Sequence, residues 1–386
     1  MLLFLCVVAA MLSLVVAVQF VVALRRVLWF PPVVSTRERP IAAKLSVIIP
    51  ARNEEEDVAQ ALQSVLDQAG VEIEVFVIND HSSDRTGAIV DAVARADCRV
   101  TVLHNPELPP GWLGKSNAMH QAAALALGTH LIFTDADIVH APTCFAAALT
   151  ELESRPLDFL SLFPEVRCVS FWENVLLPVF VGGVTQYATA GIEESDSGDA
   201  LAAGAFMLVR AEVFRTVGGF ASIRNEMFDD VSLARLIKRH GYRVGFRACP
   251  QLLQVRLFKG NRHAFWGMTK NILEILGGRL WLAPFVMLLP ILVFWTPLLA
   301  IVIGLVRKDP LLTGVAAATS GIQYGLLWLG RRIFVFRPIP ALAFPLVAVV
   351  VVCCMARAFY FHVFEGAVRW RGRTVRVRGA ASTHEP

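Results

Sequence analysis

Between residues 45 and 140, short apolar runs of strand length alternate with longer segments of helical periodicity. The strand-like runs are 45–50, 73–78, 99–104 and 131–134, and the helical segments are 54–68, 84–96 and 113–127. Parallel strands need a crossover of this length between them, usually a helix. Further strand-like runs at 159–163, 202–209 and 252–258 continue the pattern. The chain therefore predicts an α/β domain over residues 45–260, with a mostly parallel sheet.

Polar side chains follow three of these runs, where the predicted strands end. The first strand ends in Pro50-Ala-Arg52-Asn53-Glu54, the second in Asn79-Asp80, and the fourth in Asp135-Ala-Asp137. In open α/β sheets, ligands bind outside the carboxyl ends of the strands. We therefore expect these side chains to line a ligand site.

The pair Asp135 and Asp137 indicates a metal. Side chains two residues apart on an extended chain point the same way, so the two carboxylates repel each other unless a cation lies between them. Mg²⁺ and Mn²⁺ prefer such oxygen ligands and are often shared with a substrate phosphate. The alternative is a polar turn in which Asp137 caps a helix that begins at Pro142.

A second acidic pair, Asp229-Asp230, opens a helical segment. Its simplest interpretation is favourable negative charge at a helix N-terminus. The helical segment 113–127 carries one lysine, Lys115, near its start.

The two ends of the chain are strongly apolar, and 55% of all residues are hydrophobic. Residues 1–28 read as a transmembrane anchor, uncharged as far as Leu24 and followed by Arg25-Arg26, which places residues 45–260 in the cytoplasm. Residues 261–279 read as an interfacial amphipathic helix, 280–363 as transmembrane helices and 364–386 as a basic tail. The number of C-terminal spans stays open, and the 171–190 stretch fits either a membrane surface or protein core.

Net charge and cysteine content exclude other classes. The net charge is +4, and the basic residues do not interleave with aromatic ones as they do in a nucleic-acid surface, so no nucleic-acid partner is expected. The seven cysteines have no metal-type spacing, and their odd number argues against a disulfide framework. A reducing compartment for the middle of the chain fits this pattern.

Four motifs occur in this chain in the same order as in family 2 glycosyltransferases with the nucleotide-sugar-binding GT-A fold, and the chain resembles that family. These motifs are residues 50–54, the run Asn79-Asp80-x-Ser-x-Asp84, Asp135-Ala-Asp137, and Asp229-Asp230 before a helix. The stretches Pro109-Pro-Gly-Trp-Leu-Gly-Lys115 and Phe228-Asp-Asp-Val-Ser-Leu-Ala234 resemble the membrane-bound branch that includes hopene-associated and carotenoid-type enzymes.

The resemblance implies roles for the donor side of the site. Nucleoside contacts are implied for Pro50, Arg52, Asn53, Glu54 and Asp80, although Asn53 and Glu54 also suit a capped helix start. Lys115 is either a partner of the phosphate or of a sugar hydroxyl, or a solvated helix lysine. Asp135 is implied to contact the ribose or sugar, and Asp137 to hold the Mg²⁺ or Mn²⁺ that bridges the diphosphate.

On the acceptor side, the resemblance implies that Asp230 is the general base, with Asp229 as its rival, and that the reaction inverts the anomeric carbon. Arg256 either meets the diphosphate or is a surface arginine. The segment 251–258 lacks the Gln-x-x-Arg-Trp of processive synthases, so synthesis of a long polymer is not expected.

We therefore expect a metal-dependent glycosyltransferase at the cell inner membrane, multi-pass, with a cytoplasmic catalytic domain. Its expected donor is a nucleotide-diphosphate sugar, in the first instance a UDP-sugar, and its acceptor is lipid-like. A polysaccharide synthase-type subunit and a catalytically silent membrane adaptor are the alternatives. The sugar, the acceptor and the oligomeric state are not fixed by the sequence.

Overall fold

The computed structural model separates the chain into two compact units. One comprises Met1–Ala23, Arg167–Gln186 and Arg256–Pro386, and the other, which we call the catalytic unit, comprises Leu24–Val166 and Tyr187–Val255. The structure describes residues 1–28, 43–177, 190–194, 197–226, 228–276, 283–330, 334–335, 337, 342–343, 345–360, 367–370 and 373–376.

The catalytic unit is built on a seven-stranded sheet in the order β3-β2-β1-β4-β8-β6-β9. Its strands are β1 (Lys44–Ala51), β2 (Glu72–Asn79), β3 (Val100–His104), β4 (His130–Thr134), β6 (Phe159–Phe163), β8 (Phe206–Arg210) and β9 (Val244–Ala248). The pairs β2–β3, β1–β2, β1–β4 and β6–β9 are parallel. Only β8 runs against its neighbours, β4 and β6. The predicted mostly parallel α/β sheet is confirmed.

Three short strands belong to a second, smaller sheet. They are β5 (Ile138–His140), β7 (Glu165–Arg167) and β10 (Leu253–Val255). β10 pairs antiparallel with β5 and parallel with β7. Because β5 follows β4 after only three residues, the turn that carries Asp135 and Asp137 joins the two sheets.

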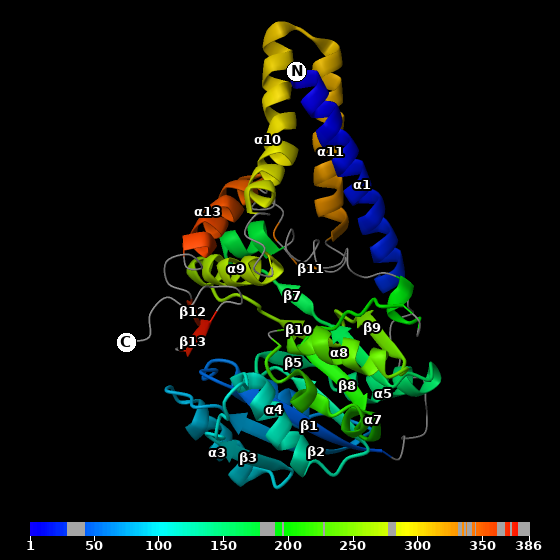
Figure 1. Cartoon of the computed structure of the whole chain (residues 1–386), viewed down its shortest axis with the longest axis vertical. Coiled ribbons are helices and arrows are strands. Elements are labelled where there is room, and N and C mark those ends of the chain that lie inside the picture. The colour runs from blue at the N-terminus through cyan, green and yellow to red at the C-terminus, as the bar shows by residue number, and fades with distance from the viewer. Residues whose placement is uncertain are drawn as a thin grey trace. The chain divides into compact units, whose positions relative to one another are not determined.

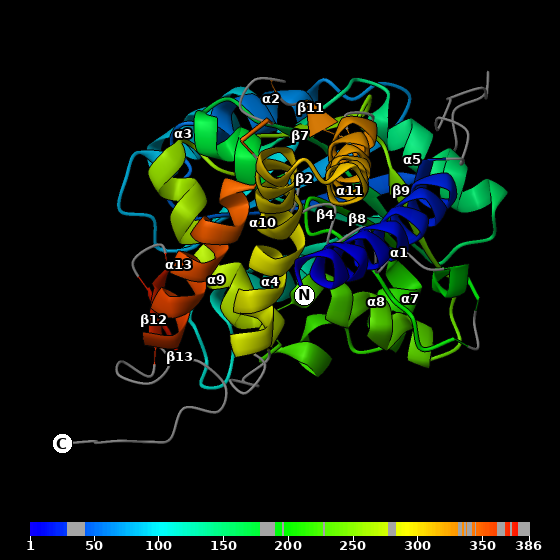
Figure 2. The same ribbon diagram turned by 90° about the horizontal axis from the view of Figure 1, so that it is seen from above.

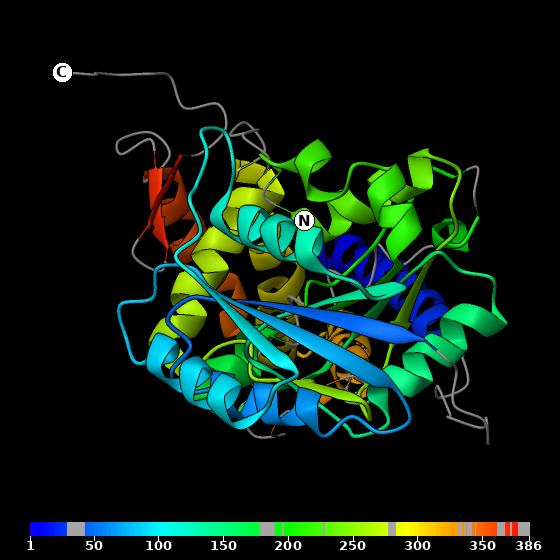
Figure 3. The same cartoon turned by 90° about the horizontal axis from the view of Figure 1, so that it is seen from below.

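Helices cover both faces of the large sheet, as parallel strands require. They are α2 (Val58–Leu66), α3 (Thr86–Ala96), α4 (Gly114–Leu125), α5 (Cys144–Ser154), α7 (Ala211–Thr216) and α8 (Asp229–Arg239), with the 3₁₀ turns η1 (Ala190–Ile192) and η2 (Gly219–Ile223). Figure 3 shows α2 and α3 on one face of β1–β3 and α4 on the other. Every residue of β4 is buried, and Phe133 at its centre packs against Phe214 and Phe220 at ring distances of 5.2 and 4.9 Å.

The other unit is largely helical. It contains α1 (Leu2–Leu28) as far as Ala23, α9 (Asn261–Leu276), α10 (Ala283–Arg307), α11 (Pro310–Gly330) and α13 (Leu346–Tyr360), together with β11 (Phe334–Val335). α10 lies beside α11 and α13 (Figures 1 and 2). The membrane spans predicted at 1–28 and within 280–363 correspond to helices, yet within the described ranges none is long and apolar enough to cross a bilayer.

A buried polar contact joins three of these helices. Pro297 has no N–H to donate to the carbonyl of Val293 one turn earlier in α10. Nε2 of Gln323, in α11, donates to that carbonyl at 2.8 Å and also to Oγ of Ser13, in α1, at 3.0 Å. Gln323 is 7% exposed, so both of its amide protons are satisfied inside the unit.

Parts of several sequence predictions lie outside the described residues. These parts are positions 178–189 of the 171–190 stretch, 277–279 of the interfacial helix, 361–363 of the last predicted span, and most of the basic tail. Within that tail, β12 (Ala367–Trp370) and β13 (Arg373–Arg376) form an antiparallel pair.

Candidate active site

The ends of β1, β2 and β4 lie side by side at one edge of the large sheet. Ala51 at the end of β1 pairs with Asn79 at the end of β2, and β4 flanks β1 on its other side. This alignment brings the polar segments after each strand to the same edge, as the sequence predicted.

Three residues beyond the first three strands adopt left-handed backbone conformations. They are Asn53, His81 and Asn105, with φ of 54°, 56° and 46°. Such angles disfavour most side chains, but Asn and His adopt them more readily and then bond to nearby backbone. Here Asn105 Oδ1 accepts the amide of His81 at 3.0 Å, and Asn53 Oδ1 accepts the amide of Ser83 at 2.8 Å. The loops after neighbouring strands therefore hold one another.

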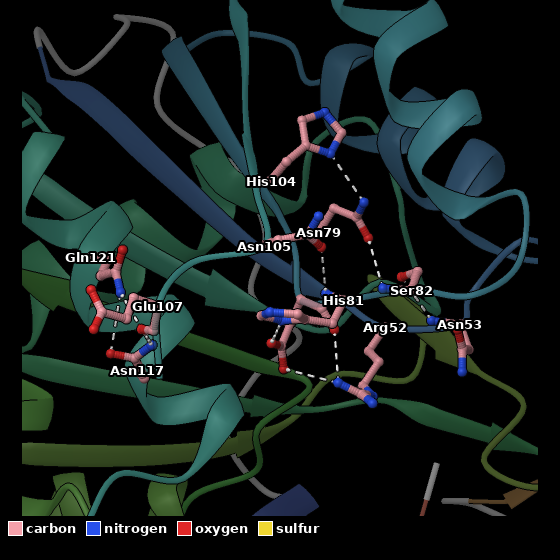
Figure 4. Close-up of polar contacts among 11 residues, drawn as sticks. Arg52, Asn53, Asn79, His81, Ser82, His104, Asn105, Glu107, Asn117 and Gln121 are labelled. Atoms are coloured by element: carbon pink, nitrogen blue, oxygen red, sulfur yellow. Dashed lines mark hydrogen bonds and ion pairs between the residues drawn. The ribbon is translucent and has the colours of Figure 1, made fainter. Parts of the chain in front are cut away.

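Arg52 and Asp80 lie together in these loops, and Figure 4 shows Arg52 beside His81. Arg52 Nη1 donates to the carbonyl of Asp80 at 3.0 Å and lies 3.9 Å from its carboxylate. The other carboxylate oxygen of Asp80 is 3.1 Å from Nδ1 of His81. Two predicted nucleoside residues are thus neighbours, and sequence analysis did not predict the third, His81.

Asn53 and Glu54 link loops and do not cap a helix. Their amides donate to Oγ of Ser82 at 3.1 Å and to Oγ1 of Thr86 at 2.8 Å. α2 begins only at Val58, after Asp57. Pro50 lies within β1, opposite Ile78.

Asn79, His104 and Asp91 form a chain of hydrogen bonds next to the same loops. Asn79 Nδ2 lies 3.0 Å from His104 Nδ1, and His104 Nε2 lies 2.8 Å from Asp91 Oδ1. Oδ1 of Asn79 accepts the amide of Ser82 at 3.3 Å (Figure 4). Because the amide nitrogen of Asn79 donates, Nδ1 of His104 accepts and its ring proton lies on Nε2, facing Asp91.

Lys115 bridges two of the predicted carboxylates. Its ammonium lies 2.7 Å from Asp135 Oδ1 and 3.7 Å from Asp229 Oδ2. Lys115 sits in the first turn of α4, and the preceding loop is held by Asn117 and Gln121, whose side-chain amides donate to the carbonyl of Glu107 (Figure 4). The charge of Lys115 is therefore paired with carboxylates of the site, although 38% of its side chain is exposed.

Gly204 marks where these groups meet. A Cβ at this position would lie 3.1 Å from Lys115 Nζ, 3.6 Å from Asp230 Oδ2 and 3.7 Å from Asp135 Oδ2. A side chain at this position would press against three charged groups, and glycine lets the backbone approach them closely. Gly204 belongs to the strand-like run 202–209, and the structure identifies the groups around it.

Asp230 is held by two backbone amides. Gly204 N donates to Oδ2 at 2.8 Å and Val231 N to Oδ1 at 2.7 Å. Burial and the neighbouring charge of Asp229 raise the pKa of Asp230 to about 6, against the opposing effects of Lys115 and the two amides. A carboxylate with such a pKa is suited to accept a proton near neutral pH.

Asp229 and Lys115 complete the charge balance. Asp229 is 8% exposed, and within the described part of the chain its Oδ2 has no hydrogen-bond partner. Burial acts to lower the pKa of Lys115, but Asp135, Asp229 and Asp230 outweigh it and the net shift is upward. Lys115 therefore stays cationic among three carboxylates.

The residues present fit a metal shared with a substrate. Asp135 and Asp137 flank the turn between β4 and β5, but no group of three potential ligands occurs among the residues described. Mg²⁺ commonly binds through one or two carboxylates and completes its shell with phosphate oxygens and water. Two carboxylates in one turn match that pattern.

Arg256 belongs to the helical unit. Its Nη2 lies 3.0 Å from Oε1 of Glu173, which also accepts the amide of Gly260. Glu173 is fully buried, and these bonds outweigh its desolvation, lowering its pKa to about 2. Arg256 is thus a partly exposed arginine, 39% exposed at its side chain, that pairs with Glu173.

Comparison with known proteins identifies the catalytic unit. Residues 46–218 match the model of the Glycosyl transferase family 2. This region is a family 2 glycosyltransferase domain. It contains the first three motifs of the site, and Asp229 and Asp230 follow it closely.

Relatives and solved structures agree with this assignment. The chain is 38% identical over 102 residues to a 4,4'-diaponeurosporenoate glycosyltransferase of Staphylococcus haemolyticus, covering 26% of each protein. It is 30% identical over 116 residues to the uncharacterized glycosyltransferase EpsJ of Bacillus subtilis, covering 30% of this chain and 32% of EpsJ. The matched segments thus span between a quarter and a third of these relatives.

A mannosyltransferase from Pyrobaculum calidifontis, solved in complex with GDP-Man and Mn²⁺, shares the fold of the family 2 domain. It superposes with a TM-score of 0.55 at 17% identity, covering 93% of this chain and 99% of that one. The domain therefore has the GT-A fold.

Proposed function

We propose that this chain is an inverting glycosyltransferase that moves a sugar from a nucleotide-diphosphate sugar to a hydroxyl group of a lipid-like acceptor. The observation that carries the proposal is the position of Asp230, which has a raised pKa and lies with Lys115 and Asp135 around Gly204. Asp230 takes the acceptor proton as the acceptor oxygen bonds to the anomeric carbon, and the bond from that carbon to the diphosphate oxygen breaks.

Lys115 and the acidic turn act on the leaving group. The Lys115 ammonium offsets negative charge that develops on the nucleoside diphosphate. A Mg²⁺ or Mn²⁺ held by Asp137 and Asp135 would supply Lewis-acid stabilisation of the same charge. Arg52 and Asp80, together with the loops around Asn53 and Glu54, orient the nucleoside.

Exposed apolar side chains support a lipid-like acceptor and a location at the inner membrane. Phe4 on α1, Leu288 and Val306 on α10, and Leu311 on α11 are 68%, 64%, 78% and 63% exposed. Large exposed apolar surface is typical of sites that contact lipid or other apolar partners. The named substrate of the staphylococcal relative, a carotenoid acid, is also apolar.

The test supplies the purified full chain, in vesicles made from a bacterial lipid extract, with labelled UDP-glucose, UDP-N-acetylglucosamine or GDP-mannose and Mn²⁺. Label that partitions into organic solvent with one or a few added sugars supports the proposal. A ladder of water-soluble saccharides favours a polysaccharide synthase. No transfer from any donor, with the chain folded, contradicts the proposal. The Asp230→Asn variant is the control for background transfer.

Sidedness has its own test, because Cys98 and Cys353 are the exposed cysteines among those described. In a Cys353→Ser background, a maleimide that cannot cross membranes should label Cys98 in broken cells and leave it unlabelled in intact cells. Equal labelling in both would place the family 2 domain outside the cell.

A further inference from the structure

The segment Ala203-Gly204-Ala205 precedes β8 and is held by side chains from both neighbouring strands. The ladder between β4 and β8 ends at the pair Thr134–Phe206, and β6 pairs with β8 as far as Ser161–Met207. Beyond these pairs, Thr134 Oγ1 donates to the carbonyl of Ala205 at 2.7 Å. Ser161 Oγ accepts the amide of Ala203 at 2.8 Å and donates to its carbonyl at 3.3 Å.

These two hydroxyls flank Gly204 on either side and are almost fully enclosed. Thr134 is 1% exposed and Ser161 is 0% exposed. Hydrogen bonds of buried hydroxyls are costly to break, because a buried amide or carbonyl that loses its partner cannot bond to water instead. The peptide of Gly204 is therefore fixed from both strands, and its N–H faces Asp230 Oδ2 at 2.8 Å.

His140 supports the Thr134 hydroxyl. Its Nε2 lies 3.1 Å from Thr134 Oγ1, and its Nδ1 lies 3.2 Å from Ser64 Oγ. Burial lowers the pKa of His140 to about 3, so the ring is neutral and carries one proton. Thr134 and Ser64 both donate their protons to backbone carbonyls, those of Ala205 and Ala61, so the neutral ring has one proton to give to one of the two hydroxyls. The contact between His140 and Thr134 closes the turn that carries Asp135 and Asp137.

We propose that Thr134 and Ser161 are positioning residues, which hold the Gly204 peptide so that its amide orients the carboxylate of Asp230. The proposal rests on the role of Asp230 in the proposed function. Thr134 links the turn that carries Asp135 to the segment that contacts Asp230, because it immediately precedes Asp135 and donates to Ala205, the residue that follows Gly204.

The test compares Thr134→Val and Ser161→Ala with the native chain, since each change removes a hydroxyl with little loss of volume. Thr134→Ser keeps the hydroxyl and serves as the rescue. Thr150→Val is the matched control, because Thr150 Oγ1 donates to the carbonyl of Ala146 at 2.8 Å within α5. Hydrogen exchange of a peptide covering 203–206, transfer kinetics with the most active labelled donor, and binding of UDP and GDP with Mn²⁺ are measured for each.

We expect faster exchange at 203–206 and a kcat on the order of tenfold to a hundredfold lower in Thr134→Val and Ser161→Ala. Donor KM and nucleotide binding should stay within about twofold, and the acid limb of the rate profile should move to higher pH, because the Gly204 bond lowers the pKa of Asp230. Thr134→Ser and Thr150→Val should resemble the native chain.

Unchanged exchange at 203–206, or an unchanged kcat, in Thr134→Val and Ser161→Ala would overturn the proposal. A loss of kcat in Thr150→Val equal to theirs would do the same, because it would indicate a general effect on stability. If exchange rises in these variants while the native chain transfers no sugar from any donor, the hydroxyl contacts stand and the proposed function fails.

Discussion

The amide of Gly204 donates a 2.8 Å hydrogen bond to Oδ2 of Asp230, and the Cα of this glycine faces Lys115 and Asp135. Gly204 thus contacts the predicted base through its amide. It also lies next to Lys115 and Asp135, the groups proposed to act on the leaving group. This relationship makes Gly204 the most direct probe of the site.

Gly204→Ala should reduce transfer on the order of tenfold or more and leave the fold intact. Its backbone lies outside the left-handed region, so alanine adds no backbone strain, but the new methyl would lie 3.1 Å from Lys115 Nζ, in the space proposed for substrate. Gly198→Ala is the matched control, since nothing lies within 4 Å of a Cβ there. Steady-state rates and melting temperatures of the two variants make the comparison, and equal rates would show that this space is not used.

Asp230→Asn should keep nucleotide binding and lose transfer by about a hundredfold or more, because the amide has nearly the same shape but cannot accept the proton. Asp229→Asn is the matched neighbour. Calorimetric binding of UDP and GDP, measured beside initial rates, separates binding from chemistry. Normal transfer by Asp230→Asn with loss in Asp229→Asn would assign the base to Asp229.

The transfer rate should rise with pH through a midpoint near 6, because Asp230 must be ionised to accept a proton and its pKa is raised to about 6. Lys115→Met should move this midpoint to higher pH, since the ammonium lowers the pKa of Asp230. Rates measured from pH 5 to pH 9 test both shifts. A flat profile over this range would exclude Asp230 as the titrating base.

The contribution of Asp230 to folding stability should fall as pH rises, in the opposite direction to the transfer rate. Folding raises the pKa of Asp230 from its ordinary value of 3.8, so the stabilisation from its protonated form is complete below that value and is lost as pH rises through about 6. Asp230→Asn should therefore raise the melting temperature at pH 8 and have little effect at pH 4. A destabilised variant at pH 8 would mean that the hydrogen bonds from Gly204 and Val231 outweigh the burial of charge.

Asp137→Ala should abolish the Mn²⁺-dependent part of nucleotide binding, because one carboxylate would remain in the metal turn. Titration of GDP and UDP with and without Mn²⁺, before and after chelation by EDTA, measures this part directly. Metal-dependent affinity equal to that of the native chain would remove Asp137 from the metal site.

Gln323→Leu should destabilise the helical unit by about 1–3 kcal/mol, because the carbonyl of Val293 would lose its donor in a buried place. In a Pro297→Ala background the backbone amide at position 297 can donate to the carbonyl of Val293. Gln323→Leu should then lower the free energy of unfolding by a smaller amount. Thermal unfolding of the four proteins in the cycle gives the coupling between the two positions. An equal loss of stability in both backgrounds would show that Gln323 does not stabilise the unit through the carbonyl of Val293.

The strands and the acidic turn were predictable because they depend on local pattern. Apolar runs such as 131–134 mark strands, and the edge at which parallel strands end follows from the βαβ alternation. β9 was missed because Arg247 interrupts its apolar pattern. This arginine is 1% exposed and is accommodated by ion pairs with Glu151 and Glu193.

The meeting of Lys115, Gly204 and Asp230 was beyond sequence reasoning. It depends on β8 entering the sheet antiparallel between β4 and β6, which is a pairing of segments far apart in the chain. Thr134, Ser161 and His81 were missed for a similar reason, since a hydroxyl or imidazole in a strand or turn gives no signal until its long-range partner is known. Thr134 was included only as a β-prone residue of its strand.

The order of the strands also bears on how the chain is synthesised. β1, β2, β3 and β4 all lie before residue 135, so their parallel half of the sheet can pair while the chain is still growing. β8 arrives much later and covers the free side of β4. Until then a nascent chain presents an open edge strand with three consecutive apolar residues, Leu131 to Phe133, which can pair with other chains. A ribosome that pauses between β4 and β8 would therefore expose the chain to aggregation at the strand that later carries the metal turn.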